Sequence, residues 1–153
     1  MNVMEEIYKR LPYGPAFRFV DGIDYVTDDE IRGHFVFKTE LPFYKAHFEA
    51  FPITPAVIIV ECMAQIGLAC FGIYLERAQW MQEQIPMFVF TAQQSTFIKP
   101  VFPNERIEVH SKKVYYRFGK LKCAVEAYNA NNELVCQGVF EGMMVDKNKL
   151  THE

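Results

Sequence analysis

The chain has 153 residues, of which half are hydrophobic and 23% are charged, and its net charge is −3. This length predicts one globular domain over residues 1–153 with ample material for a core. The lack of a strong basic bias argues against nucleic-acid binding. The first residues, MNVMEEIYKR, contain neither the basic region nor the apolar region of a secretory signal, so we expect a cytoplasmic protein.

In chain order, the first expected element is a short helix over residues 3–10, stopped by Pro12. Residues 17–26 and 30–38 are rich in aromatic and β-branched side chains and predict a β-hairpin around the TDD turn at 27–29. Residues 39–54 contain two prolines and read as irregular structure.

A helix is then expected, with Thr54 as its N-cap and Pro55 as its first helical residue. From 56 to 75 the apolar residues surround the axis, which predicts a helix that is buried on most sides. Its length of roughly 30 Å would reach across a bilayer. Because Glu61 and Gln65 lie inside the segment, no membrane span is expected.

The second half of the chain predicts four strands, at 87–98, 106–117, 120–129 and 134–145, separated by the turn-like segments KPVFPNE, FGK and ANNE. The fold class is therefore α+β, with a sheet of about six antiparallel strands wrapped around one long central apolar helix. Residues 147–153 are expected to form a flexible tail. The cysteines form no C-x-x-C pair and are expected to be reduced core residues, without a metal site: Cys62, Cys70, Cys123 and Cys136.

The segment PFYKAHFEAFPITPAVIIVECMAQ at 42–65 holds one histidine, His47, and one carboxylate, Glu61, on the apolar helix. A buried carboxylate must be paired, protonated or beside a polar cavity, and desolvation favours the neutral form that a general acid needs. The start of the helix adds free backbone N–H groups, among them that of Ala56. A base, an acid and an oxyanion donor are the groups needed to abstract a proton beside a carbonyl and expel a β-hydroxyl.

This segment resembles the active-site segment of the 3-hydroxyacyl-[acyl-carrier-protein] dehydratases, whose pattern is P-F-F-x-G-H-F-P-x-x-P-V-M-P-G-V-L-x-x-E-x-x-A-Q. The step of 14 residues from His47 to Glu61 is the step of that family. The flanking stretches LPYGPAFRFVDGI and STFIKPVFPNERI also resemble the family's opening and its strand and turn. The resemblance covers most of the chain and implies the hotdog fold.

The resemblance also implies roles and partners. His47 takes the C2 proton of a 3-hydroxyacyl thioester, Glu61 protonates the departing hydroxyl, and the Ala56 amide holds the thioester oxygen. The same pattern places Phe48, Pro55 and Gln65 at the substrate. In this family the histidine and the glutamate of one site come from two subunits, so a homodimer or a higher even oligomer is implied. The phosphopantetheine arm of an acyl carrier protein carries the substrate, the product is the trans-2-enoyl thioester, and no cofactor is needed.

The chain departs from the family pattern at three positions. Ala46 and Ala56 stand where the family has glycine, and Glu49 stands where it has proline. These changes favour a divergent branch with an altered substrate, in fatty-acid or polyene-type biosynthesis, or a protein that has lost the activity. Two alternatives therefore stay open: a hotdog acyl-thioesterase, and a non-catalytic hotdog protein that binds acyl chains.

Two further patterns are weaker. Asp29 and His34 have the D-x-x-x-x-H spacing of hotdog enoyl-CoA hydratases but lack the Asn-Pro inside that motif, so His34 is interpreted as a structural or surface residue. A basic cluster surrounds the FGK turn and is interpreted as a solvated hairpin end, or else as a docking patch for an acidic carrier protein: Lys112, Lys113, Arg117, Lys120 and Lys122.

Overall fold

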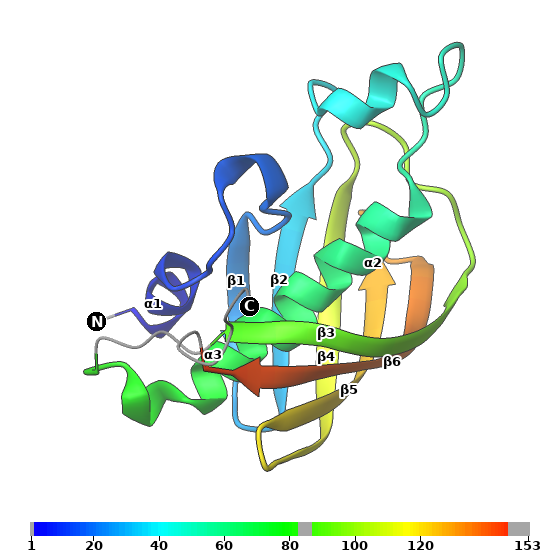
Figure 1. The fold of residues 1–153 in the computed structure, drawn as a ribbon. Coiled ribbons are helices and arrows are strands. Elements are labelled where there is room, and N and C mark those ends of the chain that lie inside the picture. The colour runs from blue at the N-terminus through cyan, green and yellow to red at the C-terminus, as the bar shows by residue number, and fades with distance from the viewer. Residues whose placement is uncertain (1, 83–86, 147–153) are drawn as a thin grey trace, which may run out of the picture.

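A six-stranded antiparallel sheet curves around one helix in the computed structural model, which describes residues 2–82 and 87–146 (Figure 1). The strands lie in the order β1-β2-β4-β5-β6-β3. Their bounds are Gly22–Val26 (β1), Glu30–Val36 (β2), Met87–Phe97 (β3), Arg106–Arg117 (β4), Lys120–Tyr128 (β5) and Leu134–Val145 (β6). The predicted α+β architecture is confirmed. The predicted tail at 147–153 lies outside the described residues.

The long helix is confirmed, and it contains a π-helical segment that the sequence did not predict. It consists of α2 (Ala56–Ala64), the π-helical η3 (Gln65–Cys70) and α3 (Phe71–Leu75). The helix start differs from the prediction by one residue, because Pro55 is the N-cap and Ala56 is the first helical residue. Thr54 does not cap, since its hydroxyl lies 2.5 Å from the Tyr44 hydroxyl and forms a buried hydrogen bond there.

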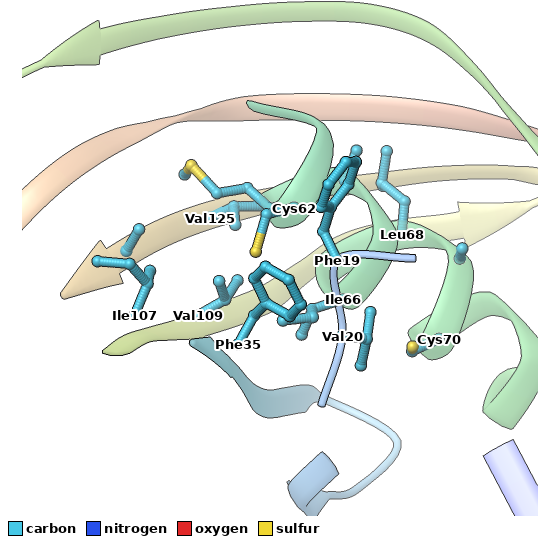
Figure 2. Close-up of a cluster of buried hydrophobic side chains, with 14 of the residues drawn as sticks. Phe19, Val20, Phe35, Cys62, Ile66, Leu68, Cys70, Ile107, Val109 and Val125 are labelled. Carbon is cyan, nitrogen blue, oxygen red and sulfur yellow. The ribbon is translucent and has the colours of Figure 1, made fainter. Parts of the chain in front are cut away.

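This helix, Ala56–Leu75, is long enough and apolar enough to cross a membrane, with a mean hydropathy of 2.1. Yet 78% of its most apolar 18-residue stretch is buried inside the protein, because the sheet wraps the helix. This burial is that of a core helix of a globular domain. The same helix and the concave face of the sheet form the hydrophobic core, in which Phe19, Ile66 and Val125 lie close together (Figure 2). All four cysteines are free and buried, as expected.

At Gly67 the helix packs tightly against strand β4 of the sheet. A Cβ atom added there would lie 3.1 Å from Ser111 of β4, and the Ser111 hydroxyl donates a 3.0 Å hydrogen bond to the Gly67 carbonyl. Both residues are buried. Glycine at this position therefore permits the close approach of helix and sheet in the middle of the π-helical segment.

The predicted first strand, 17–26, is too long at its start. Residues Pro15–Phe17 form a 3-10 turn, and β1 begins only at Gly22. The reason is that the backbone groups of Phe17 and Phe19 bond to the side chain of Gln65 on the helix and not to a neighbouring strand. The remaining strands agree with their predicted ranges to within two residues, and the short N-terminal helix α1 spans Val3–Lys9.

The two edge strands of the sheet differ in whether another element covers them. At one edge α1 lies against β1, as Figure 1 shows. At the other edge is β3, with 11 residues, whose sole strand partner among the described residues is β6, and most of its side chains are exposed. A long, exposed edge strand offers unpaired backbone groups to another chain. The β3 edge is therefore the place where this fold is open to association.

Gly138 on β6 sets how closely β3 can pack against its neighbour. A Cβ at this position would lie 2.3 Å from the Gln94 carbonyl oxygen of β3, which is backbone and cannot move aside. We predict that Gly138→Ala lowers the free energy of unfolding by about 1–3 kcal/mol. Gly14→Ala is the matched control, because nothing lies within 4 Å of its Cβ. Urea unfolding of both variants measures the difference, and equal midpoints would contradict this account of the β3–β6 contact.

Candidate active site

The loop before the helix holds His47 by backbone hydrogen bonds on both sides. The His47 N–H donates to the Phe43 carbonyl at 2.9 Å, and the Ile53 N–H donates to the His47 carbonyl at 2.9 Å. Between them, Phe48 and Phe51 exchange two backbone hydrogen bonds and close a tight turn. The peptide bond between His47 and Phe48 is cis. The loop is thus a compact unit whose ends are fixed next to the helix start.

The orientation of the His47 ring follows from one further contact. Its Nδ1 lies 3.0 Å from the Ile53 carbonyl oxygen, which can only accept a hydrogen bond. Nδ1 therefore carries the proton in the neutral ring, and Nε2 is left with a free lone pair, as a general base requires. The Phe48 ring stacks on the imidazole at 4.2 Å between ring centroids and is itself largely exposed.

Glu61 lies in the second turn of α2 and is held by Gln65, one turn further along. Gln65 has an exposure of 0%, and its amide makes three hydrogen bonds. Its Nε2 donates to Glu61 Oε1 at 3.1 Å and to the Phe17 carbonyl at 2.9 Å, and its Oε1 accepts from the Phe19 N–H at 2.8 Å. The sequence placed Gln65 at the substrate, but in the structure its amide is bonded to protein groups and fixes the carboxyl of Glu61.

The environment of Glu61 favours its protonated form. Burial raises the pKa of this carboxyl above its ordinary value, and the hydrogen bond from Gln65 offsets part of the increase. The carboxyl borders a small pocket, which is lined by Tyr13, Glu61, Ala64, Leu68, Ala69, Phe88, Val89 and Phe90. Sequence reasoning missed Tyr13, since no periodicity or spacing relates it to Glu61.

The start of the helix is open to solvent in the single chain. Ala56 is the first helical residue, so its backbone N–H has no intrahelical partner, and Ala56 is exposed. Val57 beside it is 73% exposed, which is high for an apolar residue on a core helix. The expectation of a helix buried on most sides therefore holds from Cys62 to Ile73 and not for the first helical turn.

The contacts in the structure link these groups in two sets. His47, Phe48, Pro55 and Ala56 lie on the loop and at the helix start, whereas Glu61 and Tyr13 line the pocket and Gln65 bonds to Glu61 behind it. Within the part of the chain that the structure describes, no hydrogen bond or ion pair joins His47 to Glu61. In addition, no group of three or more His, Cys, Asp or Glu side chains suited to a metal ion occurs among these described residues.

The weaker sequence patterns form no second site. His34 pairs with Asp24, whose Oδ2 lies 2.8 Å from its Nδ1, and not with Asp29. In the basic cluster, Lys120 pairs with Glu141, while Arg117 and Lys122 lie over the Tyr115 ring. Figure 1 shows the β4–β5 turn at the opposite end of the sheet from the 42–54 loop. This placement favours the solvated hairpin end over a docking patch.

Comparison with known proteins defines the class of this chain. Residues 11–138 match the model of the FabA-like domain, so the chain belongs to this family.

Among its relatives is the 3-hydroxyacyl-[acyl-carrier-protein] dehydratase FabZ of Nitratidesulfovibrio vulgaris (strain DP4), 27% identical over 146 residues, which are 94% of this chain and 92% of the relative. The enzyme of the same name from Geotalea uraniireducens (strain Rf4) is 30% identical over 137 residues, covering 82% of this chain and 85% of the relative.

Solved structures confirm the hotdog fold. The dehydratase heterocomplex ApeI:P from Xenorhabdus doucetiae is similar with a TM-score of 0.78 and 11% identity, over 94% of this chain and 93% of that chain. A hypothetical thioesterase with coenzyme A from Streptococcus pneumoniae TIGR4 has a TM-score of 0.62 and 11% identity, over 81% and 84% of the two chains. At these identities the likeness establishes the fold.

The buried amide of Gln65 yields a stability prediction. Gln65→Met keeps the volume of the side chain but leaves the Phe19 N–H and the Phe17 carbonyl without their partners. We predict a loss of about 2–4 kcal/mol in the free energy of unfolding, because each buried unsatisfied group costs about 1–3 kcal/mol. The control is Gln137→Met on an exposed position of β6. If chemical denaturation gives the same loss for both variants, the two hydrogen bonds of Gln65 to Phe17 and Phe19 do not stabilise the N-terminal segment.

Proposed function

We propose that this protein dehydrates a 3-hydroxyacyl thioester on an acyl carrier protein and forms the trans-2-enoyl thioester. The observation that carries the proposal is Glu61, a half-buried carboxyl whose pKa is raised by desolvation and which a buried amide holds at a pocket. A general acid must hold its proton at the start of the reaction. The FabA-like family and its FabZ relatives supply the reaction class.

His47 is the base in this proposal. Its Nε2 takes the proton from C2, the electrons of that bond form the C2–C3 double bond, and the C3–O bond breaks. The departing oxygen takes the proton of Glu61 and leaves as water. The Ala56 N–H, at the positive end of the helix, stabilises the negative charge that develops on the thioester oxygen. The alanine that replaces the family's glycine retains this N–H. Phe48 and Pro55 border the thioester in this arrangement.

The two halves of the site are completed by a second copy of the chain. Supporting features are the unpaired edge of β3 and the apolar side chains exposed on the loop, the first helical turn and the end of β3, namely Phe48, Phe51, Val57, Phe97 and Ile98. An antiparallel β3–β3 pairing would bury such surface and set the His47 of one subunit against the Glu61 of the other. The four free cysteines suit a reducing compartment, and we place the protein in the cytoplasm.

The activity is tested with 3-hydroxyacyl and plain acyl thioesters of acyl carrier protein over a series of chain lengths. We expect enoyl product from the 3-hydroxyacyl substrates and no free thiol from either kind. Free thiol would identify a thioesterase, and acyl binding without any product would identify a non-catalytic protein. Either result would contradict the proposal.

Substitution of the proposed acid and base should remove turnover without unfolding the protein. We predict that His47→Ala and Glu61→Gln each lower kcat by about 10²–10⁴-fold. Matched controls are His110→Ala and Glu126→Gln on the outer face of the sheet, which should keep the wild-type rate. Wild-type rates in either site variant would refute the assignment.

The raised pKa of Glu61 also predicts how the stability of Glu61→Gln compares with that of the wild type. Since its pKa is raised in the folded state, the folded protein binds more protons than the unfolded chain between the two pKa values, and stability falls as pH rises through this window. The glutamine of Glu61→Gln carries no charge, so at pH 8 this variant should be at least as stable as the wild type in urea. If Glu61→Gln is clearly less stable than the wild type at pH 8, the folded protein stabilises the carboxylate, and this would contradict a raised pKa of Glu61.

The oligomeric state follows from the open β3 edge. We predict that light scattering gives at least twice the mass of one chain at micromolar concentration. A monomer would contradict a site built from two subunits.

A further inference from the structure

The pocket beside Glu61 is very small. Its volume is about 20 Å³, which is room for about one water molecule. Side chains of the helix and of β3 close it on the apolar sides, with Leu68, Phe88 and Phe90 among them. An acyl chain does not fit into this space, whereas the hydroxyl that leaves a substrate as water does.

The second polar side chain at this pocket is Tyr13. No hydrogen bond of its hydroxyl is found among the described residues, whereas the hydroxyls of Tyr44, Tyr116 and Tyr128 bond to Thr54, Glu76 and Glu126. This hydroxyl is therefore free to donate a hydrogen bond to a group that enters the pocket.

Tyr13 is nevertheless held in place. The Arg18 guanidinium donates a 2.8 Å hydrogen bond to the Tyr13 carbonyl. Gln65 fixes the next part of the same segment through Phe17 and Phe19. Burial raises the pKa of the phenol above its ordinary value, so it keeps its proton at neutral pH and can donate a hydrogen bond.

We propose that this pocket receives the hydroxyl group that leaves C3 of the substrate, and that Tyr13 donates a hydrogen bond to its oxygen while Glu61 supplies the proton. The inference rests on the proposed dehydration. As the C3–O bond breaks, its electron pair goes to the oxygen, which takes one proton from Glu61 and becomes water. The Tyr13 proton stays on the phenol, and the hydrogen bond strengthens as negative charge develops on the leaving oxygen.

The test compares Tyr13→Phe with the wild type, since this change removes only the hydroxyl. We expect kcat for the 3-hydroxyacyl thioester to fall about 10- to 100-fold, the range for losing one hydrogen bond to a charged group, with KM changed less than about threefold. Tyr128→Phe, which removes a hydroxyl on the outer face of the sheet, should keep the wild-type rate. Thermal unfolding should show both variants folded.

A second substrate separates contact with the oxygen from displacement of the segment. The matched 3-chloroacyl thioester loses chloride, which needs no proton, so its elimination should be nearly unchanged in Tyr13→Phe. An equal loss of rate with both substrates, or no loss with the hydroxyl substrate, would overturn the role of Tyr13. If the wild type forms no enoyl product at all, the proposed dehydration itself fails. If the wild type is active and Tyr13→Phe has the same kcat, only the role of Tyr13 fails.

Discussion

The buried amide of Gln65 is the contact on which the candidate site depends. It joins the helix to the N-terminal segment through Phe17 and Phe19 and holds the carboxyl of Glu61 with its remaining N–H. A buried amide must be bonded on every side that it can be, because each missing partner costs free energy. The bonds to Phe17 and Phe19 therefore hold the segment that carries Tyr13 against the helix, and the third bond determines where the carboxyl of Glu61 points.

Much of the fold could be predicted from the sequence, and the exceptions have physical reasons. The apolar run from 56 to 75 and the β-branched runs after it predicted the helix and sheet, since burial periodicity is a local property. The strand predicted from Phe17 failed because a distant side chain, Gln65, takes the backbone hydrogen bonds of that segment. Thr54 failed as a cap for a similar reason, since its hydroxyl bonds to Tyr44.

The candidate site was predicted in part. His47 and Glu61 stood out because a carboxylate on an apolar helix and a histidine in the preceding loop are unusual, and the resemblance to a known family supplied their roles. Tyr13 was not predictable, because its place beside Glu61 comes from tertiary packing alone. The exposed first helical turn and the free edge of β3 could not be predicted from the sequence either, since both depend on how the strands are arranged around the helix.

The central claim is that one site takes its base from one subunit and its acid from the other, and subunit mixing tests it most directly. His47→Ala and Glu61→Gln are each inactive in this account, but a mixed dimer has one site with both groups intact. Unfolding and refolding an equal mixture should restore about a quarter of the wild-type rate, because half of the dimers are mixed and each has one working site. A mixture as inactive as its two components would contradict the account.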